Sequence, residues 1–154
     1  MMMTDPSTED ILLRLGGAAG LGMLLGLDWE RRGFDAGIRT HGLIALSAAL
    51  LMLSATSIAA TVLQSGGESD PLRIAQGLFQ ALGFIGAGMV FAWREEVRNL
   101  TSASSLVLTG AIGMSCGAGH WRMALIAAGL GLILMVMVRL GTRHLPGRDR
   151  AEGK

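Results

Sequence analysis

The residues best suited to chemistry in this 154-residue chain gather in one short segment between two apolar stretches. They are Asp28, Glu30, Arg31, Arg39, Thr40 and His41. Carboxylates with hydroxyl and carbonyl oxygens are ligands that Mg²⁺ accepts, so one interpretation is a cation or partner site. The other is a cluster of paired charges that anchors the chain at a membrane edge, with Trp29 in the headgroup layer. Because arginines interleave with the carboxylates, the pattern favours the anchoring interpretation.

Three residues at predicted helix starts, Asp70, Arg73 and His41, have simple structural interpretations. Asp70 precedes Pro71 and then an apolar stretch, which is typical of a helix cap followed by proline in the first turn. Arg73 lies one turn further on, where it can pair with Asp70. His41 also lies at a helix start, and without a neighbouring His or Cys it is interpreted as a hydrogen-bonded residue rather than a proton relay.

Residue types needed for catalysis are scarce. No nucleophile, base and orienting group recur at a useful spacing, and no phosphate-binding glycine loop precedes a lysine, since the only lysine is Lys154. The single cysteine, Cys116, excludes an intrachain disulfide and a cysteine-cluster metal site. No basic stripe is interleaved with aromatic residues as nucleic-acid binding requires. We therefore expect neither an enzyme nor a cofactor.

The elements that position these residues are membrane helices. Hydrophobic residues make up 51% of the chain and charged residues 16%, and the mean hydropathy is +0.49. Since a helix needs about 20 apolar residues to cross a bilayer, we looked for segments of that length nearly free of charge. Five segments qualify, at 11–27, 41–64, 72–92, 101–117 and 121–140. The sequence predicts an all-α, polytopic membrane helix bundle.

The distribution of charge predicts the orientation of the bundle. Ten of the thirteen Lys and Arg residues fall in alternate connections and in the C-terminal end from Arg139 onward. By the positive-inside rule, these regions face the cytoplasm and the N-terminus lies outside. The expected organisation is an acidic leader at 1–10, a transmembrane domain at 11–140 and a basic cytoplasmic tail at 141–154.

Polar and small residues line one face of two predicted helices. The third carries Arg73, Gln76, Gln80 and Gly83 at helical spacing, with Gly86 nearby, and the fourth carries Thr101, Ser105, Thr109, Gly113 and Gly117. Such faces either pack helices closely or line a hydrated path. Few charges lie inside the spans, so we favour packing.

Two helix-loop-helix units also look alike. One runs from Gly22 through Trp29 and mixed charges to His41, and the other runs from Gly88 through Trp93 and mixed charges to Thr101. Both would lie on the cytoplasmic side, which suggests a parallel duplication of helix pairs.

Five motifs together resemble the MgtC/SapB family of bacterial inner-membrane proteins. They are LLGLDWERR at 24–32, AGIRTH at 36–41, DPLRIA at 70–75, GFIGAGM at 83–89 and VRNLT at 97–101. The family pattern has Glu where this chain has Asp28, and Gly where it has Asn99, which can take the same left-handed backbone conformation. Many members add a cytoplasmic domain of ferredoxin-like type. Only 14 residues follow position 140 here, so we expect a short form, and a separate soluble regulatory domain is one expected partner.

The resemblance implies a regulatory protein of the bacterial inner membrane. It is associated with adaptation to magnesium limitation and, in some members, with virulence and modulation of the F-type ATP synthase through membrane contacts. Besides the lipid bilayer, the expected partners are a second copy of the chain or another membrane protein. The alternative is a small transporter or channel subunit, whose path Arg73, Gln76, Gln80 and the hydroxyl stripe of the fourth helix would line.

Overall fold

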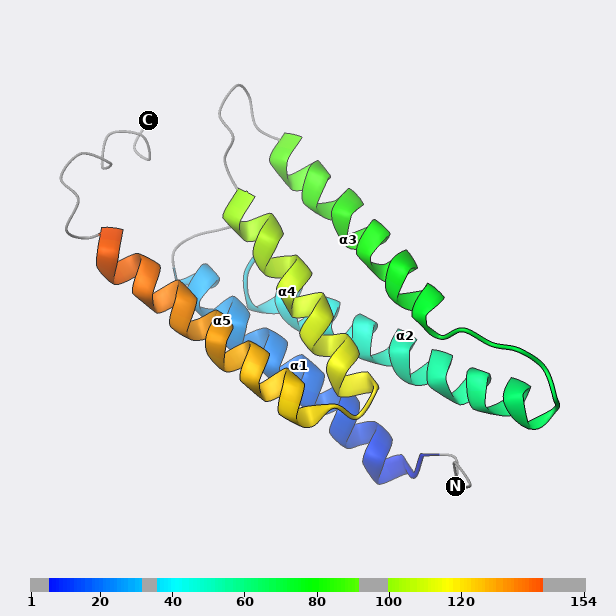
Figure 1. Cartoon of the computed structure of the whole chain (residues 1–154). Coiled ribbons are helices and arrows are strands. Elements are labelled where there is room, and N and C mark those ends of the chain that lie inside the picture. The colour runs from blue at the N-terminus through cyan, green and yellow to red at the C-terminus, as the bar shows by residue number, and fades with distance from the viewer. Residues whose placement is uncertain (1–5, 32–35, 92–99, 143–154) are drawn as a thin grey trace.

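The computed structural model describes residues 6–31, 36–91 and 100–142, and these residues form five helices (Figure 1). The helices are α1 (Thr8–Glu30), α2 (Ile38–Gln64), α3 (Leu72–Phe91), α4 (Leu100–Gly117) and α5 (Trp121–Thr142). Each segment expected to span the membrane is helical, with ends that differ from the prediction by at most three residues. The described residues form no strand, and the all-α membrane bundle is confirmed.

Consecutive helices run in opposite directions, so the chain passes from one end of the bundle to the other five times (Figure 1). α1 begins at one end of the bundle and α5 finishes at the other. This agrees with an odd number of crossings. Which end faces the cytoplasm stays a prediction from the charge distribution.

Three helices of the described part are long and apolar enough to cross a bilayer by themselves, namely α1, α2 and α4. The stretch Trp121–Met137 of α5 is apolar but shorter. α3 carries three exposed polar side chains in its first half, Arg73, Gln76 and Gln80. α3 is therefore the helix whose surface most needs an explanation.

α4 lies at the centre of the bundle and contacts all four other helices, whereas α3 contacts only α4 and α2. The core around α4 is built mainly of small residues: Ala18, Leu25, Ala45, Ala49, Ile112, Cys116, Ala124 and Ala128. Lipid provides no hydrophobic drive for helix association, so small side chains that allow close backbone approach must hold the helices together.

The closest approach is between α4 and α2. A Cβ atom added at Gly113 would meet the backbone of Ala45, and one added at Gly117 would meet the backbone of Ala49. In the same way, Gly22 of α1 lies against the carbonyl of His41. Close packing, the favoured interpretation of the α4 face, agrees with this geometry at Gly113 and Gly117.

Other glycines within the helices have open surroundings. Nothing lies within 4 Å of a Cβ atom added at Gly16, Gly20 or Gly83. Gly86 is buried instead, and its added Cβ would lie 3.4 Å from that of Ala103 on α4. Helical spacing therefore identified the small face of α3 but not which of its glycines touches α4.

The two helix pairs of the suggested duplication are both antiparallel, but they pack differently. Gly22 touches α2, whereas nothing lies within 4 Å of a Cβ atom at its counterpart Gly88. The duplication stays a hypothesis.

Gly119 ends α4 by adopting φ +79°. The N–H of Gly119 bonds to the carbonyl of Cys116, and the positive φ turns the chain so that the N–H of His120 bonds to the carbonyl of Ser115. α5 then begins at Trp121.

The contact of Gly113 with α2 predicts a difference between two glycine variants. Gly113→Ala should destabilise the bundle by about 1–3 kcal/mol, because the methyl group overlaps the α2 backbone. Gly16→Ala should leave stability unchanged or raise it by about 0.5–1 kcal/mol, since alanine favours helix and the site is open. Thermal unfolding in detergent would measure both. Equal melting temperatures would contradict the central place given to this contact.

Candidate functional site

Glu30 bridges the two helices of the predicted charge cluster. Its Oε2 accepts a hydrogen bond from the backbone N–H of Ile38 at 2.7 Å. The residue before Ile38, Gly37, has no side chain that could cap α2, so Glu30 supplies the cap from the end of α1. A Cβ atom added at Gly37 would lie 2.7 Å from that carboxylate oxygen, so the bridge also needs a glycine there.

The other members of the cluster differ in burial. Asp28 and Thr40 are half-buried, and Arg31 and Arg39 are exposed. Trp29 is only 3% exposed, so it packs inside the protein. Its ring therefore packs against protein and does not face lipid, whereas its depth at the level of the headgroups stays a prediction.

His41 is fully buried and makes two hydrogen bonds. Nδ1 lies 3.0 Å from the carbonyl of Gly37, and because a carbonyl only accepts, Nδ1 carries the proton in this contact. Nε2 lies 3.0 Å from Oγ of Ser105 on α4. His41 therefore links the start of α2 to α4, and its interpretation as a hydrogen-bonded residue agrees with this geometry.

The Ser105 hydroxyl has two acceptors within reach. Its Oγ is 2.7 Å from the carbonyl of Ser102, and Nε2 of His41 is the alternative. One turn further along α4, the hydroxyl of Thr109 donates to the carbonyl of Ser105 at 2.8 Å. Ser102, Ser105 and Thr109 are all buried. The predicted charge cluster and the hydroxyl stripe of α4 thus meet at His41.

This burial bears on the transport interpretation. Ser105 and Thr109 of the α4 stripe are buried and their hydroxyls bond to protein groups, so in the described bundle this part of the stripe lines no open path. Thr101, the first residue of the stripe, is exposed. No group of three or more His, Cys, Asp or Glu residues in the described part of the chain could hold a metal ion.

The polar face of α3 lies on the outside of the bundle. Arg73, Gln76, Gln80 and Gly83 are all exposed. Asp70 caps α3 by accepting from the N–H of Leu72 at 3.0 Å, as predicted. The predicted Arg73–Asp70 ion pair does not form, because the described residues contain a single ion pair, and it lies elsewhere. Asn99 falls outside the described residues.

Arg14 has a role that sequence reasoning missed. Its guanidinium donates to the carbonyl of Gly117 at 3.0 Å and pairs with Asp10 at 2.8 Å. A cation at the C-terminal end of α4 satisfies a carbonyl that the helix leaves open and opposes the helix dipole. The signal in the sequence was a charge inside an apolar span, but the spacing gives no indication of the distant carbonyl that it meets.

Comparisons with known proteins place the chain among membrane proteins of one family. A family model described as "MgtC family" matches residues 15–143. The chain is 33% identical over 143 residues to the Escherichia coli (strain K12) protein named "Putative magnesium transporter YhiD", covering 92% of this chain and 66% of that protein. No solved structure gives a significant match.

Two relatives named "Protein MgtC" are similar in the same region. The one from Brucella abortus (strain 2308) is 35% identical over 113 residues, 73% of this chain and 44% of its own length. The one from Salmonella typhimurium (strain LT2) is 33% identical over 134 residues, 87% of this chain and 54% of its own length. The chain thus spans between about half and two thirds of the length of these relatives.

The contact between His41 and Ser105 predicts a stability loss that a neighbouring hydroxyl does not share. Ser105→Ala should destabilise the bundle by about 1–3 kcal/mol, because it removes the partner of a buried imidazole nitrogen. Thr109→Val is the matched control, since Thr109 bonds only to a carbonyl of its own helix and valine keeps its shape. We expect the control to change stability by less than about 0.5 kcal/mol. Thermal unfolding in detergent distinguishes them, and a Ser105→Ala protein as stable as wild type would refute a structural role for this bond.

Proposed function

This chain belongs to the MgtC family, and on that premise we propose that it is a non-enzymatic protein of the bacterial inner membrane that regulates adaptation to magnesium limitation by contacting other membrane proteins. The name of the Escherichia coli relative supports the link to magnesium, and the name of the Brucella relative supports the link to MgtC. Modulation of the F-type ATP synthase, with effects on virulence, is one form that the resemblance suggests for such contact.

The observation that carries the proposal is the outward polar face of α3. Gln76 and Gln80 are exposed on a helix that only α4 and α2 support. Amide groups facing lipid lack hydrogen-bond partners, which is unfavourable, whereas the same groups can bond across a helix–helix interface. Nothing lies within 4 Å of a Cβ atom added at Gly83, so another backbone can approach the helix there. This face therefore suits a protein partner better than lipid.

We propose that the first partner is a second copy of the chain. In a two-fold dimer with its axis along the membrane normal, identical α3 faces meet at the same depth. Glutamine amides both donate and accept, so Gln76 and Gln80 of one copy can satisfy those of the other. The exposed cation Arg73 and the exposed anion Asp70 lie close together in each copy, so the same arrangement brings opposite charges together near the bilayer surface.

A transporter is the second candidate, and the name of the Escherichia coli relative YhiD favours it. The stripe of α4 is buried, so a path would have to run along the α3 faces of two copies. Magnesium flux into proteoliposomes that Gln80→Leu abolishes would support transport. Absence of flux from a protein that still restores growth at low magnesium would support regulation.

The dimer is tested by disulfide crosslinking in native membranes. Gly83→Cys should yield a crosslinked dimer on oxidation, whereas Gly129→Cys on α5 should not, although both sites are open to an added side chain. The native Cys116 is buried, so the wild-type chain is a further control. Crosslinking at Gly129→Cys and not at Gly83→Cys would overturn the proposed interface.

The regulatory function is tested by growth at low magnesium in a strain that lacks its own family member. We expect the wild-type chain and Gly129→Leu to restore growth and Gly83→Leu to fail, with equal amounts of each protein in the membrane. Failure of the wild-type chain would contradict the magnesium proposal, and full growth with Gly83→Leu would show that the α3 face is not needed for it.

A further inference from the structure

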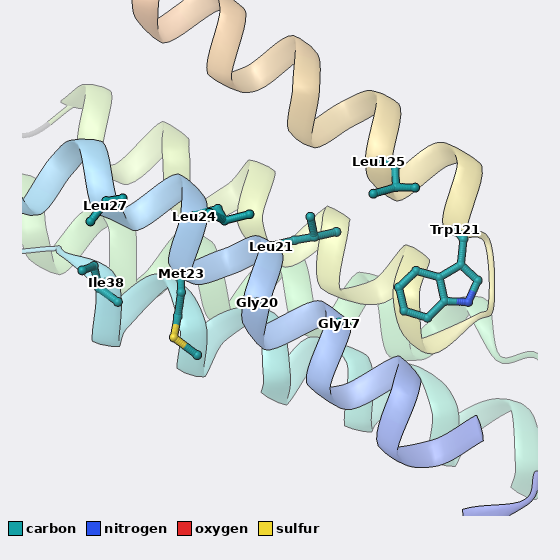
Figure 2. Close-up of a pocket in the computed structure, with 9 residues that line it drawn as sticks. All are labelled: Gly17, Gly20, Leu21, Met23, Leu24, Leu27, Ile38, Trp121 and Leu125. Atoms are coloured by element: carbon teal, nitrogen blue, oxygen red, sulfur yellow. The ribbon is translucent and has the colours of Figure 1, made fainter. Parts of the chain in front are cut away.

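A long apolar groove of about 590 Å³ runs along α1 on a side of the bundle away from α3. In Figure 2, Trp121 and Leu125 of α5 stand on one side of α1, and Met23 and Ile38 stand on the other. Its volume falls in the range of about 300–1,000 Å³ that is usual for small-molecule sites. The groove is therefore large enough for a flexible ligand of moderate size.

Glycines on α1 make the floor of the groove. Gly17 lies directly against the indole ring of Trp121, which walls that end. Gly20 has nothing within 4 Å of the position of a Cβ atom, so the floor is open beside it. From Gly17 to Leu27 the helix rises by about 15 Å at 1.5 Å per residue, which is half of a hydrocarbon core of about 30 Å. The groove thus matches the length of one lipid leaflet.

Two exposed arginines follow the lining residues at the other end of the groove. Gly17, Gly20, Leu24, Leu27 and Arg31 follow one another at intervals of three and four residues, so they share one face of α1. Arg39 follows directly after the lining residue Ile38. Both arginines are exposed, and neither belongs to an ion pair in the described part of the chain.

Three carboxylates lie in the same segment. Glu30 is exposed, but one of its oxygens is held by the N–H of Ile38, Asp28 is half-buried, and Asp35 falls outside the described residues. The exposed guanidinium groups of Arg31 and Arg39, which belong to no ion pair among the described residues, are thus the cations beside this end of the apolar channel. Guanidinium groups bind phosphate oxygens through paired hydrogen bonds.

We propose that this groove binds an anionic phospholipid, with one acyl chain along Gly20 and Leu24 and the phosphate on Arg31 and Arg39. A transmembrane helix is a poor occupant, because its diameter of about 10–12 Å and full-bilayer length exceed a groove of this volume. The arginines lie at the predicted cytoplasmic end, where basic sites between helices recognise anionic headgroups. This site is separate from the α3 face and does not depend on the proposed dimer.

Bromine quenching of Trp121 tests the proposal. The full chain, carrying Trp29→Phe and Trp93→Phe so that Trp121 is the only fluorophore, is placed in phosphatidylcholine vesicles. Phosphatidylglycerol or phosphatidylcholine with brominated chains is then added at equal mole fractions. Two arginines near the headgroup predict that the phosphatidylglycerol quenches with about tenfold higher apparent affinity.

Three variants divide the proposal into its parts. Arg31→Gln with Arg39→Gln should abolish the headgroup preference, whereas Arg122→Gln, a loss of charge beside Trp121, should keep it. Gly20→Leu should reduce quenching by both lipids, because leucine fills the open floor of the groove. Unchanged elution of this variant in size-exclusion chromatography would show that it folds.

Equal quenching by both lipids in the parent chain, or a preference that survives the double arginine variant, would overturn the phosphate site. Full quenching in Gly20→Leu would overturn the acyl-chain site.

Discussion

The close approach of the α2 and α4 backbones is the contact on which the rest of the bundle depends. In lipid, apolar side chains gain nothing by leaving one hydrocarbon surface for another, so helices associate where small residues let their backbones meet. Gly113 and Gly117 lie directly on the backbone of Ala45 and Ala49. α4 then carries α1, α3 and α5 on its remaining sides. The abundance of glycine in this chain serves that central position first.

The same seam contains the only buried histidine of the described residues. His41 lies at the start of α2, and Ser105 lies about two turns before Gly113 on the same face of α4. The packing that joins the glycines therefore also joins imidazole to hydroxyl. A polar contact in a dry interior requires well-defined geometry, because an unmatched nitrogen or hydroxyl there is unfavourable. The glycines therefore bring α2 and α4 together, and the His41–Ser105 bond sets their register.

The outer surface of the bundle carries two features of opposite kind. On α3 a polar face with Gln76 and Gln80 points away from the protein, which suits another protein copy. On α1 an apolar groove closes against Trp121 and ends near exposed arginines, which suits a lipid. A chain with this arrangement could contact a partner through one side while a lipid occupies the other. The two surfaces are independent, because α3 does not touch α1 or α5.

Hydropathy and helical periodicity in the sequence were enough to determine the five helices, because the need for about 20 apolar residues per crossing leaves little freedom. Local capping was also readable, since the bond from Asp70 to Leu72 involves neighbours in the chain. The interhelical partners of Glu30, Arg14 and His41 were decided only by the tertiary structure. Each of these partners lies on a different helix from the residue it bonds, and periodicity defines the face of a residue but not the neighbour that the face meets. For the same reason the sequence grouped Gly83 with Gly86, although only Gly86 packs against α4.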